Sequence, residues 1–281
     1  MLTFAPTPIG NIDDLSFRTL DRLAGAEVFL CEDTRVTKKL LAILKTRFDR
    51  RFFENPRFIS IHSHNEDATI ALLDASLFSR PCVFVSDAGM PCVSDPGAKL
   101  VQFCLQNGIE YEVLPGANAA ITAYAASGCD QKFIFYGFLP HKKEARSAEL
   151  SEILRLPFAA IFYESPHRIA DFADLLALLD ADRHIAAFKE LTKLHENRFI
   201  GSAKEFAIAL KNMNTKGEWT IVVFGASVRR GVEGLGEWLI DELLNLPAPT
   251  KPLSKILAKI SGEKSAIWYE RLQNAAKNRA K

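Results

Sequence analysis

The sequence lacks the cysteine pairs that would indicate a disulfide framework or a zinc site. Its five cysteines are scattered, at Cys31, Cys82, Cys92, Cys104 and Cys129. No two of them form a C-x-x-C pair, and an odd number of isolated cysteines is typical of reduced thiols in the cytoplasm. His62 and His64 have no evident third ligand nearby, so no metal site is predicted.

Long apolar runs and the pattern of a signal peptide are also missing. The longest apolar candidate, residues 116–129, is short and interrupted by polar residues and glycines. It does not predict a transmembrane helix. Residues 1–6 lack the basic and long apolar regions of a signal peptide. We therefore expect a cytoplasmic protein without a membrane partner.

What is present is the composition of an ordinary globular protein. Hydrophobic residues make up 48% and charged residues 25% of the 281 residues, which is enough apolar material for a substantial core. At about 150 residues per domain, the length predicts two domains. The net charge of +1 conceals an asymmetry, because residues 251–281 contain eight Lys or Arg and only two Glu. A basic tail on a slightly acidic body indicates a polyanionic partner.

The first half of the chain alternates between short apolar segments and segments with helical periodicity. Strands are predicted at residues 2–5, 27–31, 58–61, 82–86 and 110–114. Helices are predicted between them, at residues 14–24, 37–44, 67–77 and 99–107. This alternation predicts a mostly parallel sheet covered by helices. Asp95-Pro96 predicts the start of the last of these helices, with Asp95 as its cap.

A second series of the same kind begins near Phe133. Strands are predicted at residues 133–138, 159–163, 184–189, 197–201 and 219–224, and helices at 143–154, 167–179 and 203–211. A third segment predicts helices at 235–244, 253–260 and 265–276, the last two joined by a Gly-containing turn like that of a helix-turn-helix. We therefore predict an α/β domain at 1–127, a second at 128–228 and a helical basic tail at 229–281.

Polar and glycine-containing loops follow the predicted strands of the first half. They lie at residues 7–11, 32–35, 86–97 and 114–120. Ligands of parallel sheets bind at these carboxyl ends, although a turn, an internal ion pair or helix packing also explains each loop. The loop 86–97 contains neither G-x-G-x-x-G nor a P-loop. Asp87 beside Gly89 suits a ligand with an ammonium group, such as S-adenosylmethionine.

Ionisable residues also cluster at strand ends in the second half, at 163–168, 189–196 and 216–218. Taken together, eight ordered motifs resemble the ribosomal RNA small subunit methyltransferase I family, which belongs to the tetrapyrrole-methylase superfamily. The motifs are TPIGN, EDTR, SDAGMP with SDPG, LPGANAA, GFLP-x-KK, YESPHR, KELTKLHE and KGE. The resemblance runs from about residue 2 to residue 224 and extends to the helical tail. Met90 stands where the family often has threonine, so only its backbone is expected to make a polar contact.

The resemblance implies two α/β domains of tetrapyrrole-methylase type with S-adenosylmethionine in the cleft between them. The implied acceptor is the ribose 2′-hydroxyl of a decoding-centre cytidine in 16S ribosomal RNA, with the enzyme acting as a homodimer. The residues expected to hold the cofactor are Pro8, Asp87, Gly89, Met90, Pro91, Val93, Ser94, Pro115, Ala117, Tyr163, Lys216 and Gly217.

A ribose hydroxyl is a weak nucleophile and gains from a group that removes or orients its proton. The candidates are Glu32, Asp33, Glu164, Glu190, Lys193 and His195, and the sequence does not choose among them. RNA contact is predicted for Arg35, Lys38, Lys39, Lys142, Lys143, Arg146, Arg168, Lys251, Lys255 and Lys259. The last three recur every fourth residue and so share one helix face, which a solvated surface also explains.

Two other functions remain open at this point. A methyltransferase acting on a small precorrin-like tetrapyrrole would share the cleft, but it needs no basic tail. A non-catalytic RNA-binding factor for ribosome assembly would explain the tail, but it leaves the cofactor-type loops unexplained.

Overall fold

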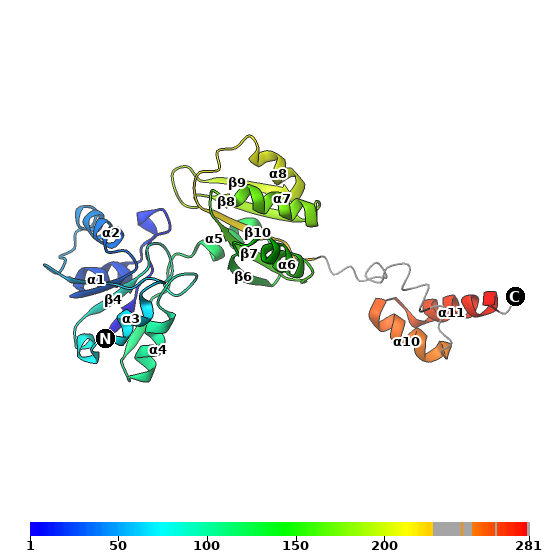
Figure 1. Cartoon of the computed structure of the whole chain (residues 1–281), viewed down its shortest axis with the longest axis horizontal. Coiled ribbons are helices and arrows are strands. Elements are labelled where there is room, and N and C mark those ends of the chain that lie inside the picture. Colours follow the sequence, from blue (N-terminus) through cyan, green and yellow to red (C-terminus); the bar gives the residue numbers. More distant parts are fainter. Residues whose placement is uncertain (227–242, 244–248, 262, 280–281) are drawn as a thin grey trace. The chain divides into compact units, whose positions relative to one another are not determined.

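The computed structural model describes residues 1–226, 243, 249–261 and 263–279 (Figure 1). The chain forms two compact units, Met1–Gly225 and Ala226–Lys281. The first unit contains two five-stranded sheets. The sheet of the first five strands is called the N-sheet below, and the sheet of strands six to ten is called the C-sheet.

The N-sheet is fully parallel, as the alternation of strands and helices predicts. Its strands are β1 (Leu2–Phe4), β2 (Val28–Cys31), β3 (Arg57–Ser60), β4 (Cys82–Val85) and β5 (Tyr111–Val113), in the order β3-β2-β4-β1-β5. The central strands are buried because both faces are covered. Since β1 and β4 are neighbours, the loops that follow them lie side by side at the carboxyl edge of the sheet.

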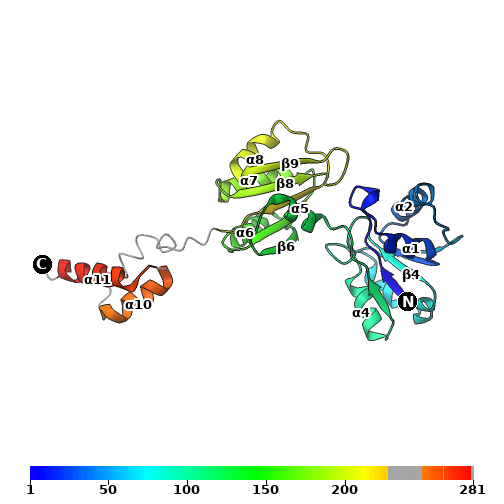
Figure 2. The ribbon, with the colours of Figure 1, turned by 180° about the vertical axis from the view of Figure 1, so that it is seen from behind.

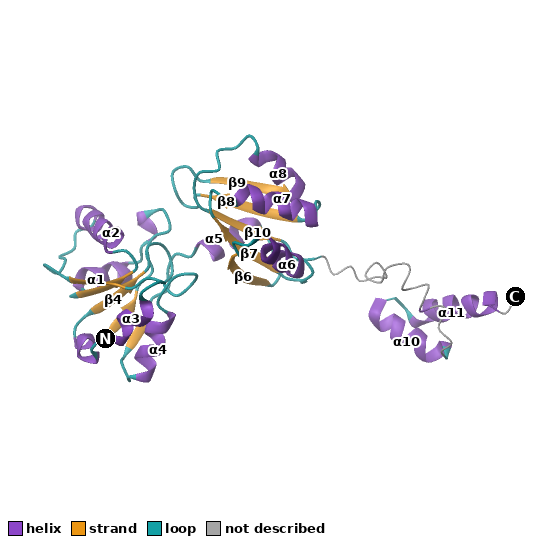
Figure 3. Cartoon of the chain, in the orientation of Figure 1, coloured by secondary structure: helices purple, strands orange, loops and turns teal. Residues whose placement is uncertain are grey.

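Helices cover both faces of the N-sheet (Figure 3). Helices α1 (Phe17–Gly25) and α2 (Thr34–Arg47) pack on one face through leucines that meet Phe29 and Val83. Helices α3 (Glu66–Ala71) and α4 (Ala98–Gln106) pack on the other face around Phe4 and Phe84. The result is a three-layer α/β/α arrangement.

Two helix predictions for this region are wrong in detail. The single helix predicted at residues 67–77 is α3 followed by a separate 3-10 helix, η2 (Ala75–Ser79), which starts where the Asp74 side chain accepts a hydrogen bond from the Ser76 N–H. Helix α4 begins at Ala98 after Gly97, and no side chain caps it. Asp95 is therefore not a helix cap.

The C-sheet is mixed. Its strands are β6 (Phe133–Phe138), β7 (Ala159–Glu164), β8 (His184–Lys189), β9 (Asn197–Ser202) and β10 (Trp219–Val223), in the order β6-β7-β10-β8-β9. Only β6 and β7 pair in parallel. Helices α6 (Lys143–Ile153), α7 (Ile169–Leu179) and α8 (Ala203–Leu210) cover one face through a core that includes Phe162, Phe172 and Phe206.

Helix α5 (Ala119–Ser127) lies on the other face of the C-sheet (Figure 2). Asn118 starts it by accepting a hydrogen bond from the Ile121 N–H, and Gly128 in the left-handed region ends it. Ala120 and Ala123 let the helix approach the sheet closely. The domain boundary at 127/128 stays a prediction, and α5, which precedes it in the chain, packs on the C-sheet.

In the second unit, helices α10 (Thr250–Ser261) and α11 (Ser265–Arg279) form the predicted helix pair. Leu257, Trp268 and Leu272 pack between them, and the Arg271 guanidinium lies 4.9 Å from the Trp268 ring centre. Nearly all of the helix predicted at 235–244 falls outside the described residues. In the part of the chain that the structure describes, no helix has both the length and the apolar character needed to cross a membrane.

Candidate active site

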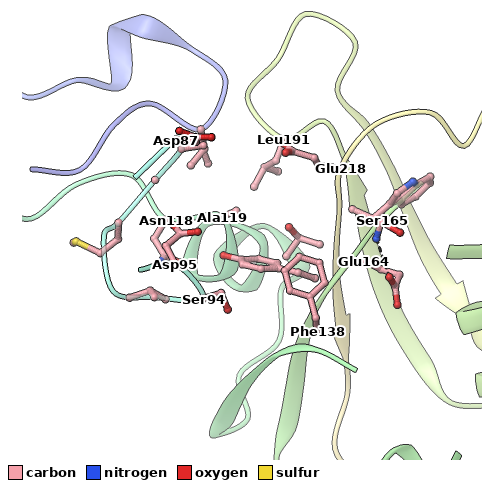
Figure 4. Close-up of a pocket in the computed structure, with 18 of the residues that line it drawn as sticks. Asp87, Ser94, Asp95, Asn118, Ala119, Phe138, Glu164, Ser165, Leu191 and Glu218 are labelled. Carbon is pink, nitrogen blue, oxygen red and sulfur yellow. Dashed lines mark hydrogen bonds between the residues drawn. The ribbon is translucent and has the colours of Figure 1, made fainter. Parts of the chain in front are cut away.

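A cavity of about 460 Å³ lies between the N-sheet and the C-sheet of the first unit, at the predicted cleft. In Figure 4, Asp87, Ser94 and Asp95 lie on one wall, and Phe138, Glu164, Leu191 and Glu218 lie on the other. The complete lining is Ile9, Glu32, Asp87, Ala88, Gly89, Met90, Val93, Ser94, Asp95, Asn118, Ala119, Phe138, Tyr163, Glu164, Ser165, Pro166, Leu191, Glu218, Trp219 and Thr220.

The N-sheet wall is built from the loops after β1 and β4. Thr7 and Gly89 exchange two backbone hydrogen bonds, with N–O distances of 2.9 Å and 3.1 Å. This pairing continues the contact of the two strands beyond their ends. Gly89 has φ +84°, a conformation that favours glycine, and a Cβ there would lie 3.2 Å from Ile9 Cγ2. The two motifs TPIGN and SDAGMP therefore form one surface.

Acidic residues from the loops after β2 and β4 brace each other on this wall. The Asp33 N–H donates to Asp87 Oδ1 at 3.1 Å, and the Asp87 N–H donates to Glu32 Oε2 at 3.4 Å. Burial raises the pKa of both Glu32 and Asp87 above its usual range. Two cavity carboxyls are therefore fixed in place and partly desolvated.

Asp33 has a different surrounding. Its carboxylate caps α2 and forms an ion pair with Arg35, with a shortest N–O distance of 2.6 Å. The hydrogen bonds from Arg35 hold the pKa of Asp33 down, at about 2. Asp33 does not line the cavity, and its carboxylate is directed to Arg35.

Asp95 does line the cavity, although its sequence context predicted a helix cap. Burial, followed by the negative charge of Glu32, raises the pKa of Asp95 to about 7. The sequence did carry one signal that pointed to it: Asp95-Pro96-Gly97 is a second Asp-x-Gly turn in the same loop as Asp87 and Gly89.

The ionisable lining of the cavity is acidic throughout. It comprises Glu32, Asp87, Asp95, Glu164 and Glu218, and among the residues that the structure describes no lysine, arginine or histidine lines the cavity. Acidic groups on low-dielectric walls create a negative potential. The cavity therefore favours a positively charged ligand.

Glu164 is the most deeply buried of these acids, with a side chain 1% exposed. Its Oε1 accepts a hydrogen bond from the Ser165 N–H at 2.8 Å, and its Oε2 lies 3.3 Å from Arg168 Nη2. Burial raises the pKa of Glu164, and the nearby guanidiniums of Arg168 and Arg146 partly offset this rise. Arg168 also donates to the Leu139 carbonyl at 2.8 Å. This cluster ties the segment after β6 to the end of β7.

Glu190, Lys193 and Glu218 form a second charged cluster at the C-sheet wall. The Lys193 ammonium lies 2.8 Å from Glu190 Oε1 and 2.9 Å from Glu218 Oε2, and the Glu218 N–H donates to Glu190 Oε1 at 2.9 Å. Burial acts to raise the pKa of Glu190, but the hydrogen bonds from Lys193 and Glu218 outweigh it and lower that pKa. Burial also opposes the charge of Lys193, whose pKa is nevertheless raised by the two carboxylates.

A glycine makes this second cluster possible. Gly217 has φ +125°, and a Cβ there would lie 2.6 Å from Glu190 Cγ. Glu190 itself has φ +53°. The motifs KELTKLHE and KGE therefore pack closely against each other. This packing places Glu218 in the cavity wall.

Half of the predicted cofactor residues line the cavity: Asp87, Gly89, Met90, Val93, Ser94 and Tyr163. The other half do not: Pro8, Pro91, Pro115, Ala117, Lys216 and Gly217. Among the proton-transfer candidates, Glu32 and Glu164 are in the lining, Glu190 and Lys193 contact the lining residue Glu218, and His195 is exposed. All of these assignments stay predictions. The lining residues that sequence reasoning missed include Asp95, Phe138 and Glu218.

The residues predicted to contact RNA divide into two groups. Eight are exposed: Arg35, Lys38, Lys39, Lys142, Lys143, Lys251, Lys255 and Lys259. Arg146 is 7% exposed, and the Arg168 side chain is 15% exposed. The charge of these two arginines therefore lies beside Glu164, beneath the surface.

Within the described residues, no three His, Cys, Asp or Glu side chains gather as a metal site would require.

Comparison with known proteins agrees with the motifs. A family model described as Tetrapyrrole (Corrin/Porphyrin) Methylases matches residues 1–207. The ribosomal RNA small subunit methyltransferase I of Campylobacter fetus is 41% identical over 275 residues, which cover 97% of this chain and 99% of that protein. The chain belongs to the ribosomal RNA small subunit methyltransferase I family. Its predicted family and enzyme class, an S-adenosylmethionine-dependent methyltransferase, are thereby confirmed.

Other relatives carry the same name over most of the chain. The Helicobacter pylori J99 protein is 39% identical and covers 97% of both chains, and the Bacillus subtilis protein is 37% identical over 81% of this chain and 76% of its own length. Among solved structures, a cobalt precorrin-4 methyltransferase matches with a TM-score of 0.56, 17% identity and coverage of 79% and 94%. A Thermus thermophilus uroporphyrin-III C-methyl transferase complexed with S-adenosyl homocysteine matches with a TM-score of 0.55, 19% identity and coverage of 81% and 98%. These two structures confirm the predicted fold.

Proposed function

We propose that this chain transfers a methyl group from S-adenosylmethionine to the 2′-hydroxyl of a decoding-centre cytidine in 16S ribosomal RNA. The observation that carries the proposal is the cavity, which the family's own motifs build and whose ionisable lining, within the described part of the chain, is acidic. The curated relatives supply the class of acceptor, because they are named as methyltransferases of small-subunit ribosomal RNA.

The cavity fits the methyl donor in charge and in size. S-adenosylmethionine carries a sulfonium and an ammonium group against one carboxylate, so a cavity lined by Asp87 and Asp95 attracts it. The volume of about 460 Å³ falls within the range of about 300–1,000 Å³ that small-molecule sites occupy. Tyr163 and Phe138, whose ring centres are 5.7 Å apart, supply aromatic surface for the adenine.

When bound, the donor supplies a methyl group on a positively charged sulfur, a leaving group that needs no protonation. The protein then has to align the acceptor hydroxyl and receive its proton. Glu32 and Glu164 both line the cavity, and burial raises the pKa of each above its usual range. Glu164 is paired with Arg168, so Glu32 suits this step best among the sequence candidates. Asp33 is held as a carboxylate of low basicity, and Lys193 is held as an ammonium.

Exposed basic residues support an RNA acceptor. Arg35, Lys38 and Lys39 lie on α2, at the end nearest Asp33 and the cavity carboxyl Asp87. Lys251, Lys255 and Lys259 are exposed on α10 in the second unit. Neutralising phosphates with such side chains is the main source of affinity for RNA. A homodimer and a cytoplasmic location stay predictions.

The two alternative functions have less support. The tetrapyrrole methyltransferases among the solved structures are 17% and 19% identical, a likeness that concerns the fold alone. A non-catalytic assembly factor leaves the acidic cavity without a role.

Mass spectrometry of 16S ribosomal RNA from cells that lack the gene tests the proposal. We expect one decoding-centre cytidine to lose 14 Da, and the wild-type gene to restore it. Glu32→Gln should restore it poorly, whereas the matched change Glu152→Gln, at an exposed position in α6, should restore it fully. An unchanged methylation pattern in the deletion strain would contradict the RNA acceptor and favour a tetrapyrrole.

A further inference from the structure

We propose that residues 10–11 and 190–193 form a latch between the two walls of the cavity, and that Thr192 is the positioning residue which holds it closed. The latch joins the loop after β1 of the N-sheet to the loop after β8 of the C-sheet. The inference rests on the proposed function in one respect, namely that the cavity between these walls holds S-adenosylmethionine.

The latch is a direct contact between backbone and side chain. The Asn11 N–H donates a hydrogen bond to Thr192 Oγ1 at 3.1 Å. A Cβ on Gly10 would lie 2.5 Å from Lys193 Cγ, 2.6 Å from Thr192 Oγ1 and 2.9 Å from the Leu191 carbonyl oxygen. The two loops therefore approach so closely that only a glycine fits at position 10.

The backbone of the second loop is strained to make this contact. Thr192 has φ +66° and Glu190 has φ +53°. A β-branched residue in the left-handed region is uncommon, because its side chain crowds the backbone there. It is held by the Glu196 carboxylate, which accepts a hydrogen bond from the Thr192 N–H at 2.7 Å, and by the Lys193 N–H, which donates to the Glu190 carbonyl at 3.0 Å. The strained turn directs the Thr192 hydroxyl toward Asn11.

The latch is directly connected to the lining of the cavity. Ile9 precedes Gly10, Leu191 is itself part of the latch, and both line the cavity and belong to one hydrophobic cluster. On the far side of the latch, Lys193 pairs with the lining residue Glu218. Loss of the Asn11–Thr192 hydrogen bond therefore lets the two cavity walls move apart at this edge. The donor must then bring the walls together when it binds, which weakens its affinity.

The test compares variants of the full-length protein by calorimetric titration with S-adenosylmethionine. Thr192→Val keeps the shape and branching but removes the hydrogen-bond acceptor, and we expect it to weaken affinity about 3- to 10-fold, the range for one hydrogen bond. Thr192→Ser keeps the hydroxyl and should bind within about twofold of wild type. In Thr192→Val alone, the Asn11 amide should exchange its hydrogen faster with solvent.

A second pair of variants leaves Thr192 unchanged. Gly10→Ala places a methyl group in the contact and should weaken donor binding as Thr192→Val does. Gly25→Ala is the matched control, because a Cβ there meets nothing within 4 Å, and its affinity should equal that of wild type. This pair keeps the test decisive if a substitution at Thr192 prevents folding.

Three outcomes would overturn the latch: equal affinity of Thr192→Val and wild type, equal weakening by Val and Ser at position 192, or weaker binding with unchanged exchange of the Asn11 amide. Failure of the proposed function has a different signature. In that case wild-type protein itself would not bind S-adenosylmethionine.

Discussion

The affinity for S-adenosylmethionine should rise as pH increases through neutrality, because of Asp95. Burial and then the charge of Glu32 raise its pKa to about 7; the charges of Asp87 and Glu218 add to this rise, and a hydrogen bond from Ser86 opposes it. None of these groups is a cation that could hold Asp95 ionised. A positively charged donor favours the ionised carboxylate, so binding competes with protonation of Asp95.

The size of the effect follows from the fraction of Asp95 that is ionised. With a pKa of about 7, about a tenth of the carboxyl is ionised at pH 6 and about nine tenths at pH 8. If the donor binds only the ionised form, its dissociation constant falls about tenfold over this interval, and about half a proton is released per donor bound at pH 7.

Calorimetric titration at pH 6, 7 and 8, in two buffers of different ionisation enthalpy, measures both quantities. Asp95→Asn removes the titrating group and should make affinity nearly independent of pH over this range, whatever its absolute value. The role of Asp95 would be refuted if wild-type protein released no proton on binding the donor. It would also be refuted if the affinity of Asp95→Asn still depended on pH.

The raised pKa of Asp95 also has a consequence for folding. In the unfolded chain this carboxyl ionises near its ordinary value of 3.8, whereas in the folded protein it ionises near 7. Its contribution to stability therefore declines as pH rises from about 4 to about 7 and is lowest above that range. Asp95→Asn should raise the melting temperature of the ligand-free protein at pH 8 but not at pH 4.

Three further predictions concern the glycine fit and the basic helices. Gly217→Ala should destabilise the protein by about 2–3 kcal/mol in urea unfolding, because it strains φ and collides with Glu190, whereas Gly108→Ala, with φ +63° in open space, should cost only about 1 kcal/mol. Trp268→Ala should cost the helix pair of the tail about 3–5 kcal/mol, seen as loss of helical circular dichroism in that unit at a lower temperature. Replacing the exposed residues Lys251, Lys255 and Lys259 by alanine should leave donor affinity unchanged. The number of counterions released on RNA binding, measured from the salt dependence of the affinity, should fall by about 2–3.

The sequence predicts the strands well because most of them are short, largely apolar runs with clear ends. Strands β6 and β8 begin and end at the predicted residues, 133–138 and 184–189. The extent of α5 was not predicted, because alanine-rich residues 119–127 have no apolar and polar faces that alternate with helical periodicity. Its position is set instead by packing against the C-sheet, which only the folded chain reveals.

The site was harder to predict than the fold, for two physical reasons. Charge can be read from a sequence, but burial cannot: Arg146 has the charge of an RNA contact, yet it lies beside Glu164 in the interior. Local chemistry can also be overridden by tertiary structure. Asp95-Pro96 has the pattern of a helix start, but Gly97 takes the capping position and leaves the Asp95 carboxyl to the cavity.

The glycines of the motifs explain why the motifs occur together. Gly89 pairs with Thr7, Gly10 meets Thr192, and Gly217 meets Glu190, so the missing Cβ of each glycine leaves room for an atom of another motif. Each of these motifs is therefore packed closely against its partner motif. The loop Ser86–Pro91 forms one wall of the cavity because TPIGN lies against it, and TPIGN reaches the opposite wall because Thr192 accepts its hydrogen bond. The cavity is therefore a property of several motifs acting as one unit, and a substitution in one loop should change ligand binding at residues far away in the sequence.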